Sequence, residues 1–455
     1  MIAYLLPEIF LLTGTMATML TSLWFDKKAI HTTLITLFLS LVSLYFINVS
    51  QSYGWVVDSL SIGSSAFIIV MTGLIILGVR PALDRFNIES GPICTMVLLA
   101  TLGCLIVVST DHLLLLFLGT VLIALPSYAL CTLSIDEQHS DEAGFKYFVM
   151  GSISGVVFLY GLSFFYGATG QLTLGVLEAS NTDLWLGVGL SLIVCALIFK
   201  LGAFPFHYWV PDVYQASSLP FAYWVIAIPK VSYVIALIRI LARYGSLVGP
   251  VLWYVGVGSL LFGSIMAYLQ KDFRRMLGYA SITQMGIVCL LLQLDNLNAW
   301  VYALMYLIVY ILSIVLLWQV LINTSTTHLF NASISQLHQW VKDNRSNGLV
   351  VLITLASLAG IPFTMGFVVK IAALTYLVTQ ESWWVLAIIL FSFSLSAYYY
   401  LAALRAMYFD AILFMSGGRQ EWTVTHLGAM GVFALGIYPL PLYYFCAYTL
   451  QGVLL

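Results

Sequence analysis

Three lysines stand inside apolar stretches that are long enough to cross a membrane: Lys200, Lys230 and Lys370. A charged side chain in such a segment is costly, and residues of this kind usually belong to functional sites. Low dielectric disfavours the ammonium form, so a lysine placed there can release and take up a proton in a working cycle. Lys230 has apolar neighbours on both sides and cannot easily snorkel to an interface. The three lysines together therefore predict a proton path rather than structural side chains.

The stretch FKLGAFPFHYWVPDVYQ, residues 199–215, places Lys200 at a predicted helix break. Pro205 interrupts the helix because proline lacks a backbone donor and clashes with the preceding turn. His207 follows the break and is a candidate relay group beside the lysine. A broken helix at membrane depth is tolerated only where protein or a wet cavity covers the freed backbone groups. The stretch therefore predicts a site inside the membrane.

A second break is predicted in the apolar run 347–378, which is too long for one straight span and contains Gly360, Ile361 and Pro362. Two long interrupted segments, each with a lysine, are typical of inverted repeats with a site near the membrane midplane. We expect an N-terminal three-helix segment, two inverted five-helix repeats and a C-terminal helix. These parts would be residues 1–92, 93–242, 248–408 and 409–455.

Composition predicts an all-α polytopic membrane protein. Hydrophobic residues make up 62% of the 455 positions and charged residues 8%, whereas soluble domains carry about 25% charged residues. The net charge of -2 points to neither a nucleic acid nor a basic surface-bound protein. Apolar runs of spanning length predict about 14 helices, at 2–24, 30–49, 57–79, 93–110, 112–131, 145–167, 184–208, 220–242, 248–269, 274–293, 298–322, 347–378, 383–408 and 425–450.

The basic residues predict the orientation. With the N-terminus outside, 12 of the 17 Lys and Arg residues fall on the cytoplasmic side, and only Arg239 and Arg243 fall on the outer side. This asymmetry is what the positive-inside rule requires. An even number of helices then places both termini on the periplasmic side.

The other polar residues carry weaker signals. All 19 carboxylates fall at helix ends or in loops, and we interpret Glu8 and Asp58 as N-terminal charges favoured by the helix dipole. The six cysteines have no metal-ligand spacing, and we find no nucleotide loop or haem pair. We therefore expect no metal site and no redox cofactor in this chain. Plausible relay partners of the lysines are His207, Tyr279, Ser281, Thr283, Gln284 and Tyr398.

Several stretches resemble the antiporter-like membrane subunits of respiratory complex I, the bacterial NADH:quinone oxidoreductase. The resemblance covers nearly the whole chain, and the PDVYQ ending at 211–215 is similar to the N-subunit (subunit 2) branch. The other matching stretches are LLPEIFLL at 5–12, LLATLGCLIVVSTDHLLLLFLG at 98–119, EAGFKYFVMGSISG at 142–155, LYGLSFFYGATG at 159–170, KDFRRMLGYASITQMG at 271–286, SLAGIPFTMGFVVK at 357–370 and SAYYYLAALRAMY at 396–408.

The resemblance implies a fold of fourteen helices with two inverted five-helix repeats and broken helices 7 and 12. It implies that Lys200, Lys230 and Lys370 form a proton path coupled to quinone reduction elsewhere in the complex. NADH, FMN, iron–sulfur clusters and quinone would then belong to the whole complex, and the partners would be the other membrane-arm subunits in the cell inner membrane.

The chain departs from the family pattern at two positions. The family has a fifth-helix glutamate in a G-x-E-L-x-x-L-P pattern, and here that position is Val121. The missing carboxylate would normally pair with Lys200, and its loss disfavours the charged lysine. Gln284 stands where the family often has a histidine, which removes one titrating group.

Three functions remain open from the sequence. The first is a proton-pumping subunit of complex I, and the second is a subunit of a multi-subunit cation/proton antiporter. The third is a complex I scaffold that has lost pumping. Val121 favours the scaffold, whereas retention of all three lysines opposes it because an idle buried charge is easily lost.

Overall fold

The computed structural model describes residues 5–47, 50–52, 54–133, 137–175, 184–216, 219–294, 296–324, 334, 345–378, 383–408 and 424–452. The predicted polar loop between 323 and 346 lies largely outside these residues. The described chain forms two compact units. One contains residues 1–201, 224–251 and 448–455, and the other contains 202–223 and 252–447.

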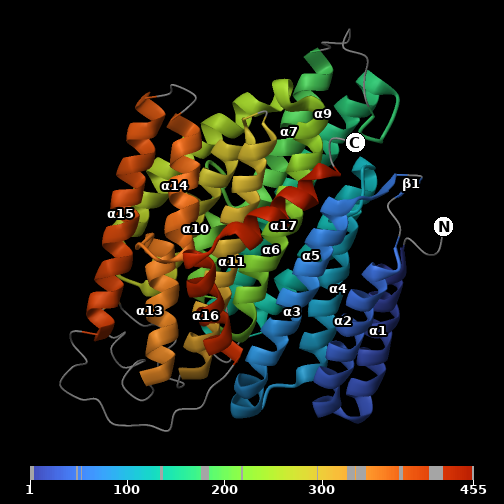
Figure 1. Ribbon diagram of the computed structural model, residues 1–455. Coiled ribbons are helices and arrows are strands. Elements are labelled where there is room, and N and C mark those ends of the chain that lie inside the picture. The colour runs from blue at the N-terminus through green and yellow to red at the C-terminus, as the bar shows by residue number, and fades with distance from the viewer. Residues whose placement is uncertain are drawn as a thin grey trace. The chain divides into compact units, whose positions relative to one another are not determined.

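The first unit is built from helices and one short hairpin. Its elements are α1 (Leu6–Trp24), the 3-10 helix η2 (Asp26–Lys28), α2 (Ala29–Tyr45), β1 (Ser50–Ser52), β2 (Trp55–Val57), α3 (Ser59–Phe86), α4 (Ser90–Val108), α5 (Leu113–Thr132), α6 (Glu137–Thr169) and α7 (Leu184–Leu201). Helices α1, α2 and α4 pack side by side (Figure 1). Helices α6 and α7 approach closely at Gly161 and Gly189, where an added Cβ would lie 2.8 Å from the facing backbone.

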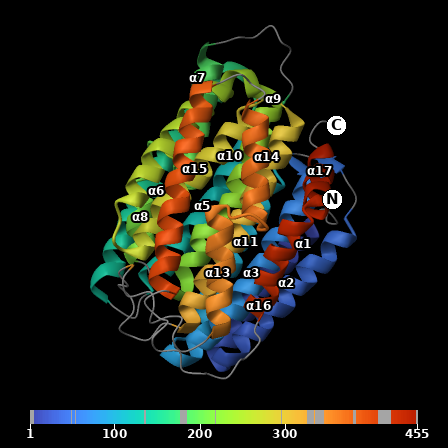
Figure 2. The same ribbon diagram turned by 60° about the vertical axis from the view of Figure 1, so that its left-hand side comes forward.

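The second unit contains α8 (Trp209–Ala216), α10 (Phe273–Leu292), α11 (Leu297–Thr324), α13 (Arg345–Ala359), α14 (Met365–Val378), α15 (Trp383–Tyr408) and α16 (Val424–Ile437). Two elements, α9 (Leu219–Tyr268) and α17 (Leu440–Gln451), contribute residues to both units. Figure 2 shows α13 and α14 following one another, with α15 alongside both.

The described helices account for fourteen membrane segments. Eleven are long and apolar enough to span, and α16 with α17 forms a further pair bent by 88°. The predominantly apolar segment Trp224–Tyr268 has 45 residues and would measure about 67 Å as a helix. That is twice the hydrocarbon thickness of about 30 Å, so α9 supplies two segments, with non-helical backbone at Tyr244 between them. Helices α13 and α14 together make one broken segment.

The chain is therefore a multi-pass, all-α membrane protein, as predicted. The two predicted helices at 220–242 and 248–269 are joined in one kinked element rather than separated by a loop. Both predicted breaks are present, after Leu201 and after Ala359. The division into inverted repeats at 93–242 and 248–408 stays a prediction.

Candidate functional site

Lys370 has the most closely defined setting of the three lysines. It lies on α14 and is only 6% exposed. Its Nζ donates to the carbonyl oxygens of Leu358 at 2.7 Å and Ala359 at 3.0 Å, which are the last residues of α13. The last carbonyls of a helix have no partner within it and carry partial negative charge. The ammonium group therefore occupies the negative end of the broken helix, and the ring of Phe393 lies 5.1 Å from its Nζ.

The break itself is built from residues that tolerate an unusual backbone. Gly360 has a φ of +84°, and a Cβ there would lie 2.9 Å from Cδ of Lys370. On the other side of the break, the backbone N–H of Gly366 donates to Oγ of Ser357 at 3.2 Å. Ser313 on α11 also donates to that oxygen at 3.3 Å. The break is thus fixed by side chains and positions Lys370 against the end of α13.

Gly360→Ala is expected to destabilise the chain, whereas Gly431→Ala is the matched control. A left-handed conformation costs a residue with a Cβ about 1–2 kcal/mol, and here the methyl group also meets Lys370. Gly431 is helical, its φ is not positive and nothing lies within 4 Å of an added Cβ. We expect a lower thermal midpoint of the purified protein for Gly360→Ala only. Equal midpoints for the two variants would contradict this account of the break.

A small cavity of about 20 Å³ adjoins the Lys370 side chain. That volume holds about one water molecule. Most of its exposed wall is apolar, but several lining residues carry polar groups; the full lining is Gln284, Tyr306, Val309, Tyr310, Ser357, Leu358, Gly366, Val369 and Lys370. The cavity therefore has room for one water beside groups that can hydrogen-bond to it.

Of the predicted relay partners on α10, Gln284 lines this cavity. Ser281, Thr283 and Gln284 are buried, and Tyr306 on α11 donates to the amide oxygen of Gln284. Tyr279 is also buried at 8% exposure. Tyr398, which was also predicted as a relay partner, is 59% exposed and does not line this cavity. The two residues after it, Tyr399 and Tyr400, are the buried ones, at 3% and 1%. The sequence shows three adjacent tyrosines, but it does not show which of them faces the interior of the protein.

The first break contains His207. The backbone turns at Gly202, with φ +72°, and the N–H of Phe204 donates to Oγ of Ser259 at 2.9 Å. His207 is 1% exposed, and its ring centroid lies 4.3 Å from that of Phe262. Neither ring nitrogen has a well-aligned hydrogen-bond partner among the described residues. The imidazole is therefore available to a water or a proton within its aromatic surroundings.

The remaining predicted positions lie in the first unit. Lys200 is the penultimate residue of α7 and is half-buried, whereas Lys230 in the first part of α9 is 4% exposed. Val121 lies on α5 and is half-buried. Lys200 and Lys230 thus belong to one unit, and His207 and Lys370 belong to the other.

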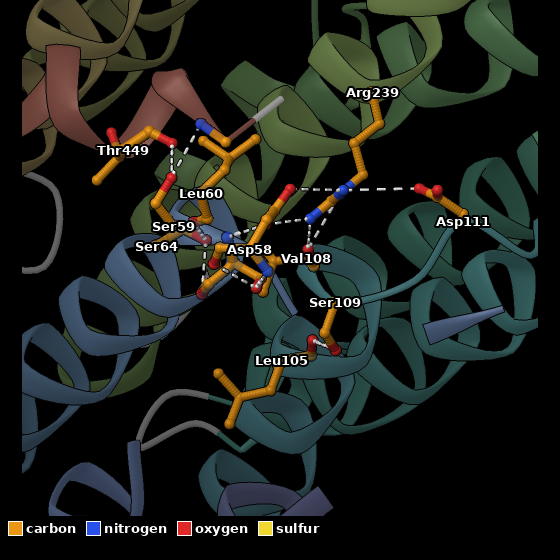
Figure 3. A network of polar contacts seen from close by, with 12 residues as sticks. Asp58, Ser59, Leu60, Ser64, Leu105, Val108, Ser109, Asp111, Arg239 and Thr449 are labelled. Carbon is orange, nitrogen blue, oxygen red and sulfur yellow. Dashed lines mark hydrogen bonds and ion pairs between the residues drawn. The ribbon is translucent and has the colours of Figure 1, made fainter. Parts of the chain in front are cut away.

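A buried charge network in the first unit was missed by sequence reasoning (Figure 3). Arg239 was assigned to the outer side by the distribution of basic residues, and its burial, at 3% exposure, was not predicted. Its two Nη atoms donate to the two carboxylate oxygens of Asp58 at 3.1 and 2.9 Å. It also donates to the carbonyl of Val108, at 2.9 Å from Nη2. Asp111 lies 3.6 Å from Nη1 and pairs with Arg243 as well.

The interpretation of Asp58 as a helix N-terminal charge is confirmed. Its carboxylate accepts from the backbone N–H of Ser61 at 2.8 Å and caps α3. The ion pair with Arg239 is the additional role. The sequence did contain a signal for this ion pair. Arg239 is a charged residue at the end of an apolar run, and Asp58 and Asp111 stand at ends of other predicted helices on the same predicted side. Glu8 lies in the first turn of α1, and Ser109 donates to it at 3.4 Å.

Comparisons with known proteins agree with the resemblance. Residues 110–396 match the family model for the transmembrane part of NADH:quinone oxidoreductase and Mrp antiporters. NADH-quinone oxidoreductase subunit N of Laribacter hongkongensis is 31% identical over 97% of this chain and 96% of its own length.

Solved structures share the fold over nearly the full length. A chain of respiratory complex I from Thermus thermophilus with bound aureothin is similar with a TM-score of 0.80 and 27% identity, covering 96% of this chain and 98% of that one. A chain of the Mrp complex from Dietzia sp. has a TM-score of 0.83 at 18% identity, covers 99% of both chains, and indicates the fold alone. The predicted resemblance to N subunits is confirmed. The chain therefore belongs to the NADH:quinone oxidoreductase/Mrp antiporter family of transmembrane proteins.

Proposed function

We propose that this chain is a proton-translocating membrane subunit of an NADH:quinone oxidoreductase. It would move protons through Lys200, Lys230 and Lys370, with His207 in support, while quinone is reduced elsewhere in the complex. The observation that carries the proposal is Lys370, a buried lysine that binds the carbonyl end of a broken helix beside a cavity of about one water's volume. A buried charge in that position is a functional-site hypothesis for any membrane protein.

The setting of Lys370 supports proton exchange rather than a fixed structural charge. Two helix carbonyls stabilise the ammonium form, whereas burial disfavours it. A proton that leaves Nζ can enter the adjoining cavity, which has room for about one water. A modest change in the local field can then move the proton between Nζ and a water in the adjoining cavity. In this proposal, quinone reduction elsewhere in the complex is coupled to proton movement in this chain through a change in the electric field at Lys370.

Val121 distinguishes this chain from the family pattern. A valine on α5 gives Lys200 no carboxylate from that position. We propose that Lys200 works without this partner, or that a neighbouring subunit supplies the acid. Lys230, which is buried in the same unit, would then carry the larger part of proton transfer there.

The rest of the complex supplies the redox chemistry in this proposal. This chain would bind no redox cofactor, and NADH, FMN, iron–sulfur clusters and quinone would belong to other subunits. It would lie in the cell inner membrane with both termini on the periplasmic side. Its partners would be other membrane-arm subunits and lipid. The exposed apolar side chains at the end of α1, including Leu20, Leu23 and Trp24 at 62, 73 and 80%, suit either partner.

Proton translocation is tested with the intact complex in liposomes, by measuring protons moved per electron. Lys230→Ala is expected to lower this ratio while quinone reduction and assembly are retained. Lys146→Ala is the matched control, because Lys146 is 46% exposed and forms an ion pair with the nearby, exposed Glu142. We expect the control to leave the ratio unchanged. Val121→Glu is expected to raise the ratio, since it restores a carboxylate that favours a charged Lys200.

The outcomes separate the three functions. An unchanged ratio in both Lys230→Ala and Val121→Glu, with the complex assembled, would favour the scaffold. Copurification with antiporter subunits and no quinone-reducing partner would favour the antiporter subunit.

A further inference from the structure

Two buried phenols of the second unit lie close together, and one of them lines the Lys370 cavity. Tyr310 lies on α11 and lines the cavity beside Lys370. Its hydroxyl lies 3.4 Å from the hydroxyl of Tyr214 on α8. The two residues are 3% and 1% exposed, so neither phenol reaches bulk solvent by itself. Ser281 on α10 faces both hydroxyls.

The residue after Tyr214 on α8 belongs to a polar cluster that reaches the surface. Gln215 follows Tyr214, and its backbone carbonyl accepts from Arg274 at 3.0 Å while its side-chain oxygen accepts from Arg275 at 2.9 Å. Arg275 also pairs with Asp212 at 3.2 Å. The side chains of that pair are 34% and 30% exposed. A proton can therefore reach this cluster from water.

We propose that Tyr214 and Tyr310 carry protons between the surface cluster at Asp212 and Arg275 and the cavity at Lys370, with water carrying the proton between the cluster and the Tyr214 hydroxyl. This inference rests on the proposed function. Each hydroxyl both donates and accepts. A phenol that receives a proton from one side releases its own proton to the other side and remains neutral. The last transfer is from Tyr310, through a cavity water, to a neutral Lys370 amine, which becomes an ammonium. No bond other than O–H and N–H bonds forms or breaks.

The predicted orientation of the chain indicates the side of the membrane on which the route begins. Arg274 and Arg275 were assigned to the cytoplasmic side by the distribution of basic residues. The route would therefore give Lys370 access to cytoplasmic protons. The 3.4 Å separation of the two phenols is longer than the usual O–H···O bond of about 2.7–2.8 Å. Rotation of a hydroxyl or entry of one water would complete the connection between the two phenols.

Tyr306 is the other phenol at the cavity, and it serves a different purpose. Its hydroxyl donates to the side-chain oxygen of Gln284. An amide oxygen accepts but cannot pass on a proton as a hydroxyl can. We therefore assign Tyr306 to fixing the cavity wall and Tyr310 to the route.

The test uses the whole complex in liposomes and the variants Tyr310→Phe and Tyr214→Phe. Each removes one hydroxyl and keeps the ring that fills the buried space. Tyr398→Phe is the matched control, because Tyr398 is 59% exposed. We expect either buried variant to slow the proton uptake carried by this chain at least about tenfold, in line with the contribution of a positioned proton-transfer group. Quinone reduction should continue, and the control should match the wild type.

Lys370→Met in the same assay distinguishes a failure of the tyrosine route from a failure of the proposed function. If Lys370→Met lowers protons per electron while both tyrosine variants match the wild type, the route is wrong and the proposed function stands. If none of the three variants changes the number of protons moved per electron, both the proposed function and the tyrosine route are wrong. If one tyrosine variant does not assemble, the other decides, since the two residues lie on different helices.

Discussion

Arg239→Ala lowers the free energy of unfolding by about 3–5 kcal/mol, the cost of removing one partner from a buried ion pair. The reason is that Asp58 would stay buried, at about 5% exposure, and would lose both donors of the guanidinium group. The carbonyl of Val108 loses its donors at the same time. We expect a lower thermal midpoint and less of this chain in the purified complex.

Two further variants test whether the loss of stability in Arg239→Ala comes from the buried ion pair. Lys146→Ala breaks an exposed pair with Glu142 and should change stability by less than about 1 kcal/mol, as surface pairs do. Asp58→Leu combined with Arg239→Met removes both charges and should recover much of the loss. A thermal midpoint for Arg239→Ala equal to that of Lys146→Ala would show that the buried pair does not hold this unit together.

Lys370→Met is the second variant with a large expected effect. Methionine fills a similar length without a charge, so the space beside Gly360 stays occupied. The carbonyls of Leu358 and Ala359 lose their donor, and an unsatisfied buried acceptor costs about 1–3 kcal/mol. We expect a modest fall in thermal midpoint and a large fall in protons moved per electron.

The control for Lys370→Met is Lys271→Met, because Lys271 belongs to the same unit but is exposed. It should leave both the midpoint and the proton ratio unchanged. Lys370→Met with a wild-type proton ratio in an assembled complex would remove Lys370 from the proposed path.

Much of the fold could be predicted because membrane burial leaves a strong pattern in the sequence. Runs of apolar residues predicted the membrane-spanning segments, and the interruptions of two runs by glycine and proline predicted both broken helices. The position of each break was less well predicted. Pro205 and Pro362 suggested the breaks, but the helices end at Leu201 and Ala359, just before glycines with positive φ. Proline prevents a helix from continuing, whereas glycine supplies the backbone conformation in which it ends.

The candidate site was predicted in part. Lysines in apolar runs could be found one by one, since burial of a single charge is unusual wherever it occurs. The partners could not be found in that way. Asp58 and Arg239 are 181 residues apart in the sequence, and no local pattern connects them. The choice of Tyr399 and Tyr400 over Tyr398 depends on how α15 is rotated against its neighbours, which an apolar stretch without a polar face does not reveal.

The most direct measurement of the central claim is protons moved per electron by the liposome-reconstituted complex carrying Lys230→Ala, Lys370→Met, or both. If the lysines act in series on one path, each single variant lowers the ratio and the double variant lowers it no further than the more severe single variant. Losses that add would indicate two independent paths. A wild-type ratio in the double variant, with assembly and quinone reduction intact, would contradict proton translocation through this chain.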